Sequence, residues 1–242
     1  MPRRHFFTPG SALALEQRTR TENLREAPEV GAGSCTHVDV PAPPGVLILR
    51  GVAGPDDGYV EIANKFAEAG YGVLVHGWQV RGDDPPDQEV AADASAALKY
   101  LASRNDLRGR DIGVVGYCRG GAHGVLVANN NPGIRALVLV HGMSRRRALD
   151  EGHPSHPIDL AANVRCPVLI LHGDADDISP IEGMRELEKV VASSNEVAFT
   201  SYPSARHGFA VRTHRGFLAA AAEDAHKKTI DFLYRHLPVS TS

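Results

Sequence analysis

Residues 114–121 read Val-Val-Gly-Tyr-Cys-Arg-Gly-Gly. A β-branched apolar pair leads into the pattern G-x-C-x-G, and a stretch compatible with a helix follows. Glycines two residues to either side of Cys118 let a strand and a helix approach closely, while the residue between them takes strained backbone angles. The segment therefore predicts a nucleophile elbow, a tight strand-to-helix turn with Cys118 at its tip.

The position of Cys118 also favours reactivity. A thiol at the N-terminus of a helix meets partial positive charge, which stabilises the thiolate. The alternative is that Cys118 is a small buried hydrophobic residue and that the glycine spacing arose by chance. The placement between a strand and a helix favours the nucleophile.

Working outward from the elbow, the chain alternates short apolar runs with segments of helical period. Unbroken runs rich in β-branched residues are typical of strands buried on both faces of a parallel sheet. Apolar residues at spacings of three and four mark the helices between them. The alternation predicts an α/β fold, a doubly wound and mostly parallel sheet with helices on both faces. The strands are expected at 46–49, 73–75, 114–115, 136–140, 168–171 and 197–202, and the helices near 59–70, 90–101, 181–190 and 222–233.

The ends of the chain differ from this central part. Residues 1–33 are polar and unpatterned and predict a partly extended N-terminal arm. Residues 36–40 alternate apolar and polar side chains, as a strand with one wet face does. No linker or repeat divides residues 34–238, which we expect to form a single domain, followed by a tail at 239–242.

Composition excludes several classes of protein. The 242 residues contain 26 Lys and Arg against 29 Asp and Glu, a formal net charge of −3, and the longest basic run is Arg145–Arg147, so we expect no nucleic-acid partner. Apolar runs stop far short of the roughly 20 residues that cross a bilayer, so we expect no membrane partner. Cys35, Cys118 and Cys166 are too few and too scattered for a disulfide framework, which indicates a reducing, cytoplasmic location.

Two further strand ends carry polar residues suited to catalysis. Asp174, Asp176 and Asp177 follow the run at 168–171, and His207 follows the run at 197–202. Any one of these aspartates could simply cap or solvate a loop. Together with Cys118, however, they give the order nucleophile, acid, histidine, which is the order of the triad in α/β-hydrolases.

At these residues the sequence resembles the dienelactone hydrolase family over about residues 36–236. The resemblance is carried by Gly-Tyr-Cys-Arg-Gly-Gly at 116–121, by Gly173-x-x-Asp176 with Pro180, and by Tyr202…Ala205-x-His207-x-Phe209. It implies the α/β-hydrolase fold for residues 34–238 and makes Asp176 the acid.

The resemblance also implies a mechanism. Cys118 attacks an ester or lactone carbonyl, with His207 as base held by Asp176. Backbone N–H groups of Arg119 and of Val52, after the first buried strand, would hold the oxyanion. No metal or organic cofactor is expected. The short histidine spacing at 153–156 lies in a polar loop and does not alter that expectation.

Recognition of the substrate departs from the family pattern. Family members commonly carry a glutamate that meets the resting cysteine, where this chain has Gly51. They also resemble one another in gripping a substrate carboxylate with two arginines. Arg81 matches the first, but the second position is Val211, and Arg212 lies one residue further on. Trp78 and His141 are further candidates for the pocket wall, with packing roles as the alternative.

The sequence therefore predicts a hydrolase of a small carboxylic ester or lactone, with dienelactone as one candidate substrate, working as a monomer or homodimer. One alternative keeps the Cys118, Asp176 and His207 triad but makes the protein an acyltransferase or thioesterase. Another is a non-catalytic small-molecule or redox sensor with the same fold, since an accessible thiolate also oxidises readily.

Overall fold

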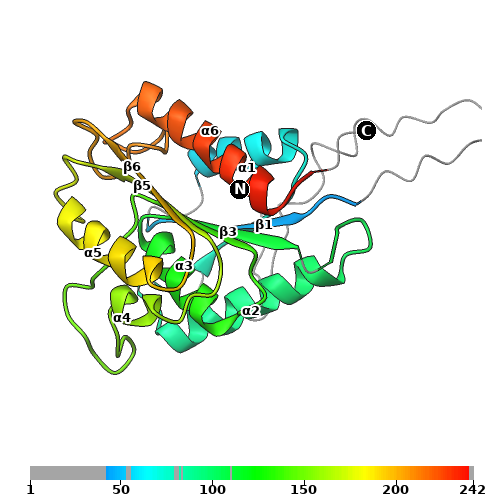
Figure 1. The fold of residues 1–242 in the computed structure, drawn as a ribbon, viewed down its shortest axis with the longest axis horizontal. Helices are drawn as coiled ribbons and strands as arrows, with labels where there is room; N and C mark the ends of the chain where they lie inside the picture. Colours follow the sequence, from blue (N-terminus) through cyan, green and yellow to red (C-terminus); the bar gives the residue numbers. More distant parts are fainter. Residues whose placement is uncertain (1–41, 53–55, 79–81, 83, 110, 240–242) are drawn as a thin grey trace, which may run out of the picture.

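The computed structural model describes residues 42–52, 56–78, 82, 84–109 and 111–239 (Figure 1). Within them, six strands form one sheet in the order β2-β1-β3-β4-β5-β6, and every neighbouring pair is parallel. Each predicted apolar run falls in a strand, so the predicted sheet is confirmed. The expected arm at 1–33 and strand at 36–40 lie outside the described residues. The strands are β1 Gly45–Leu49, β2 Gly72–His76, β3 Ile112–Tyr117, β4 Ala136–Val140, β5 Val168–Gly173 and β6 Val197–Tyr202.

Helices cover both faces of the sheet (Figure 1). Helices α1 and α6 pack on one face, and α2, α3, α4 and α5 pack on the other. None of the described helices is long and apolar enough to cross a membrane. Their bounds are α1 Asp57–Glu68, α2 Asp87–Ser103, α3 Arg119–Asn130, α4 Pro157–Ala161, α5 Ile181–Ala192 and α6 Ala219–His236.

The two helical layers create two hydrophobic cores. In β1, Leu47 and Leu49 join the core under α2 to α5, whereas Val46 and Ile48 join the core under α1 and α6. All five residues of β1 are buried, because alternate side chains of a strand point to opposite faces and both faces are covered. The central strands β1, β3, β4 and β5 are buried throughout in this way, which explains their apolar runs in the sequence.

The order of the strands positions the site. The chain runs from β1 to β2 on one side and returns to β3 on the other, so β1 and β3 flank a reversal of strand order. Ligands in open parallel sheets bind beyond the carboxyl ends of the strands at such a reversal. The elbow after β3 lies at this point.

The elbow has the geometry predicted from the sequence. Cys118 precedes α3 with φ 54° and ψ −122°, a strained conformation for a residue with a side chain. A Cβ atom on Gly116 would lie 2.2 Å from the carbonyl oxygen of Gly120, and one on Gly120 would lie 2.1 Å from the carbonyl oxygen of Leu49. Only glycine allows β1, β3 and α3 to approach this closely.

We expect Gly120→Ala to lower the free energy of unfolding by about 3 kcal/mol, the upper range for overpacking a core, because its methyl group must push backbone apart. Gly133→Ala is the matched control, since a Cβ atom there meets nothing within 4 Å. It should change stability by less than about 1 kcal/mol. Urea denaturation of both variants measures the difference, and equal stabilities would contradict the close approach at Gly120.

Candidate active site

The structure brings Cys118, Asp176 and His207 together at the carboxyl edge of the sheet. They follow β3, β5 and β6 respectively. His207 Nε2 lies 2.9 Å from Cys118 Sγ, and His207 Nδ1 lies 2.8 Å from Asp176 Oδ2. The thiol is 8% exposed and the carboxylate residue 5%, so the line of three groups is almost dry.

The turn after β5 selects one of the three candidate aspartates. Asp176 Oδ1 accepts the backbone N–H groups of Ile178 at 3.0 Å and Ser179 at 2.8 Å, which leaves Oδ2 facing His207. Asp174 instead accepts the N–H of Ser204 at 2.6 Å. Asp177 forms an exposed ion pair with Arg206 at 3.1 Å.

Electrostatics favour a thiolate and an imidazolium in the resting site. Burial opposes both charges, but the hydrogen bonds to Asp176 and Cys118 raise the pKa of His207 to about 10. Burial is the largest single influence on the Cys118 thiol and opposes the thiolate, but the hydrogen bond and charge of His207 and the N–H groups of Arg119 and Val52 together lower its pKa. Both shifts favour the thiolate–imidazolium ion pair over the neutral thiol and imidazole.

Two backbone N–H groups also face the sulfur. Those of Arg119 and Val52 act on Cys118 as hydrogen-bond donors and help to lower its pKa. Arg119 is the first residue of α3, and Val52 follows β1 with its side chain 56% exposed. Donors that already converge on the sulfur are well placed for an oxyanion formed next to it.

Tyr59 is a member of this region that the sequence reasoning missed. Its hydroxyl accepts the N–H of Gly51 at 2.8 Å. A Cβ atom on Gly51 would lie 3.0 Å from that hydroxyl and 3.0 Å from Cys118 Cβ. The space in which a glutamate at this position would begin is thus occupied by Tyr59, and only long-range packing of α1 against β1 could have revealed it.

Trp78 and His141 are both buried. The indole N–H of Trp78 donates to the carbonyl of Arg50 at 2.9 Å, and its ring packs against His123. The His141 ring lies 5.2 Å from that of His207, centroid to centroid, and neither of its nitrogens has a hydrogen-bond partner among the described residues. Burial lowers the pKa of His141 far below its usual value, so this ring is neutral. Both side chains are enclosed by protein in this structure, and their predicted part in the pocket wall stays a prediction.

Arg81 and Arg212 are the two arginines that were compared with the family's carboxylate-binding pair. Arg81 lies outside the described residues. Arg212 is turned toward α1, where it forms an ion pair with Glu61. It lines a cavity of about 300 Å³ between α1 and α6, whose lining includes Tyr117 but none of Cys118, Asp176 and His207. Val211, at the expected position, is fully buried.

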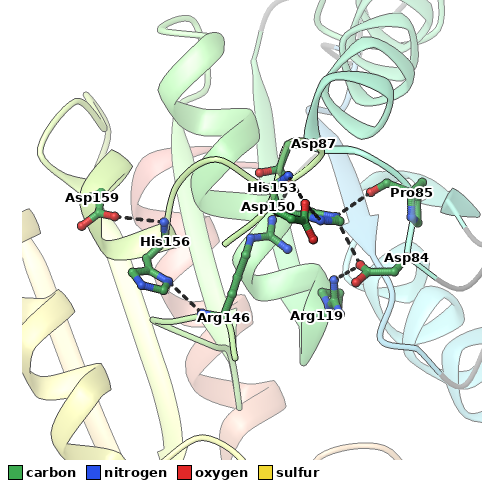
Figure 2. Close-up of polar contacts among 9 residues, drawn as sticks. All are labelled: Asp84, Pro85, Asp87, Arg119, Arg146, Asp150, His153, His156 and Asp159. Carbon is green, nitrogen blue, oxygen red and sulfur yellow. Dashed lines mark hydrogen bonds and ion pairs between the residues drawn. The ribbon is translucent and has the colours of Figure 1, made fainter. Parts of the chain in front are cut away.

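The histidines at 153 and 156 are engaged in hydrogen bonds (Figure 2). His153 faces Asp150 and the carbonyl of Pro85, and His156 accepts the N–H of Arg146. In the described part of the chain, no three His, Cys, Asp or Glu residues are grouped to hold a metal ion.

A parallel sheet in this order, with an elbow after β3, is the architecture of the α/β-hydrolases, and solved structures agree. A Klebsiella pneumoniae protein described as a dienelactone hydrolase superposes with a TM-score of 0.74 at 22% identity, over 83% of this chain and 90% of that one. A dienelactone hydrolase-like phosphotriesterase from metagenomic libraries superposes with a TM-score of 0.66 at 20% identity, over 81% of this chain and 88% of that one.

Residues 32–237 match the model of the Dienelactone hydrolase family, and the chain belongs to that family. A Methylorubrum extorquens protein with a carboxymethylenebutenolidase-like name is 25% identical over 213 residues, 80% of this chain and 72% of its own. A Bradyrhizobium protein named as a 2-oxo-3-(5-oxofuran-2-ylidene)propanoate lactonase is 25% identical over 210 residues, 80% and 84% of the two chains. The protein is accordingly a hydrolase of the kind that acts on lactones and esters.

The ion pair predicts how Cys118 reacts with iodoacetamide as the pH changes. The thiolate forms above its lowered pKa, so alkylation should be half-maximal below the value of about 8.5 for a free thiol. A second, smaller change in rate is expected near pH 10, where His207 loses its proton. Mass spectrometry of the Cys118 peptide measures both.

His207→Ala should move the first midpoint upward, because the thiolate loses its counter-ion. Asp177→Asn, which removes an exposed charge from the same turn, should leave it in place. A wild-type midpoint at the free-thiol value would contradict the ion pair.

Proposed function

We propose that this protein hydrolyses small carboxylic esters or lactones through a thioester acyl-enzyme, with Cys118 as the nucleophile. His207 acts as base and then acid, and Asp176 orients it. The observation that supports this most directly is the continuous line from Sγ to Nε2 at 2.9 Å and from Nδ1 to Oδ2 at 2.8 Å. Each group in that line faces the partner that its role requires.

In the first step the thiolate attacks the carbonyl carbon. A C–S bond forms, and the π electrons of the carbonyl move onto oxygen, where the N–H groups of Arg119 and Val52 stabilise the charge. When the tetrahedral intermediate collapses, the C–O bond to the leaving group breaks. The imidazolium of His207 gives its proton to the departing alkoxide, which leaves a thioester on Cys118.

In the second step His207, now neutral, takes a proton from water as the water attacks the thioester. A second oxyanion forms at the same N–H groups, and its collapse releases the carboxylic acid and restores the thiolate. Asp176 keeps Nδ1 protonated throughout, so that Nε2 is the nitrogen that exchanges protons. The scheme uses no metal or organic cofactor, and Arg81 is our candidate for a further contact with substrate.

Turnover of 4-nitrophenyl acetate and butyrate tests the proposal. Cys118→Ala and His207→Ala should each abolish activity, and Cys118→Ser should retain at most a trace. Asp176→Asn should lower kcat by a factor on the order of 10⁴, because the amide holds the wrong tautomer of the imidazole. Asp177→Asn is the matched control and should stay close to wild type. Circular dichroism verifies that each variant is folded.

The outcomes separate the alternatives. If Cys118→Ala kept its activity, Cys118 could not be the nucleophile. If Asp176→Asn stayed active, a group other than Asp176 would have to orient His207. A folded wild type whose Cys118 alkylates rapidly but which turns over neither ester would contradict hydrolysis of simple esters and favour the sensor.

A further inference from the structure

The residue directly after Cys118 carries a positive charge that is already neutralised. The guanidinium of Arg119 forms an ion pair with Asp84, which lies in the loop between β2 and α2 (Figure 2). The side chains are 20% and 50% exposed. Because Asp84 follows β2 and Arg119 follows β3, the pair lies at the carboxyl edge of the sheet, where the thiol is also placed.

Asp84 is held from a second side by His153. The Nε2 atom of His153 lies 3.4 Å from Asp84 Oδ1 and 3.1 Å from the carbonyl oxygen of Pro85. Its Nδ1 lies 2.9 Å from Asp150 Oδ1. Both ring nitrogens thus face oxygen atoms, so contacts on two sides hold the ring.

The loop that carries His153 is itself anchored. Arg146 pairs with Asp87 at the start of α2, and each side chain is only 10% exposed. The N–H of Asp87 also donates to the carbonyl of Gly152 at 2.9 Å. An isolated surface ion pair is a weak constraint, but a network shared by three segments keeps Asp84 in place over Arg119.

A carboxylate fixed at this position affects which substrates can approach. An unpaired guanidinium next to the nucleophile would attract a substrate carboxylate as a bidentate partner. Here that partner is Asp84. A substrate carboxylate must either displace Asp84 from Arg119 and His153 or lie beside it, and placing like charges together is costly. An uncharged ester meets neither obstacle.

We propose that Asp84 is a specificity-determining residue that occupies Arg119 and so directs the enzyme to uncharged esters and lactones, against substrates with a carboxylate on the acyl chain. The inference rests on the proposed function and names the substrate class of the same site.

The experiment compares two substrates that differ in one charge, 4-nitrophenyl hexanoate and mono-4-nitrophenyl adipate. Both have a six-carbon acyl chain and release the same phenolate. The readout is the ratio of their kcat/KM values, adipate over hexanoate. Wild type should prefer the hexanoate at least about tenfold, and Asp84→Asn should raise the ratio by about tenfold. Adding Arg119→Met to Asp84→Asn should remove that gain, because the freed guanidinium is what binds the adipate.

Asp150→Asn is the matched control. It removes one negative charge from the same network, at a position that contacts His153 but not Arg119. Its ratio should equal that of wild type. A ratio that rises as much in Asp150→Asn as in Asp84→Asn would show a general charge effect and overturn the specific role of Asp84.

Salt provides a test that needs no variant. Raising the ionic strength from about 0.05 M to about 0.5 M screens the repulsion, so the wild-type ratio should rise. A ratio that falls with salt, or a wild type that prefers the adipate, would show that a cation governs recognition and would overturn the proposal. Failure to hydrolyse the hexanoate at all would instead contradict the proposed function.

Discussion

The site depends on one close approach between backbones, that of the first turn of α3 to the end of β1. The gap allows no side chain at Gly120, whose Cβ atom would lie 2.1 Å from the carbonyl oxygen of Leu49. The same approach forces Cys118 into a positive φ. The close approach also brings the backbone N–H groups of Val52, after β1, and Arg119, in α3, toward the sulfur of Cys118. Strained backbone and convergent donors are thus two results of a single packing contact.

Around this contact the charges alternate in sign. The sulfur of Cys118, whose pKa is lowered, faces the imidazolium of His207, which faces the carboxylate of Asp176. Further out, the guanidinium of Arg119 pairs with the carboxylate of Asp84. Burial opposes the charged form of each inner group, as it does in His141, but the pKa values of His207, Asp176 and Cys118 all shift toward the charged form because each group has a partner within hydrogen-bonding distance.

The sequence predicts the sheet and the elbow because both follow from local rules. Strands buried on two faces are apolar throughout, and a tight strand-to-helix turn needs glycine. Asp174, Asp176 and Asp177 cannot be told apart from residue type, since the N–H groups of the turn decide which carboxylate is aimed at His207. The family resemblance, rather than the residues, selected Asp176.

Contacts between segments far apart in the chain could not be predicted from the sequence. Tyr59 meets Gly51 only because α1 packs against β1, and Asp84 meets Arg119 across 35 positions of the chain. The sequence does not show which residue pairs with a given charged side chain, so it could not predict that Asp84 pairs with Arg119.

The departures from the family pattern all concern charged groups near Cys118. Tyr59, a neutral hydroxyl, occupies the space where a glutamate would begin at Gly51. The one-residue shift to Arg212 turns a cation away to Glu61, and Asp84 neutralises Arg119. Each change removes a free charge from the approach to Cys118. Unpaired charges close to Cys118 would attract or repel charged substrates, more strongly at low ionic strength. Under the proposed mechanism, selection among esters then rests on contacts with the carbonyl group that all such substrates share and on the candidate contact at Arg81.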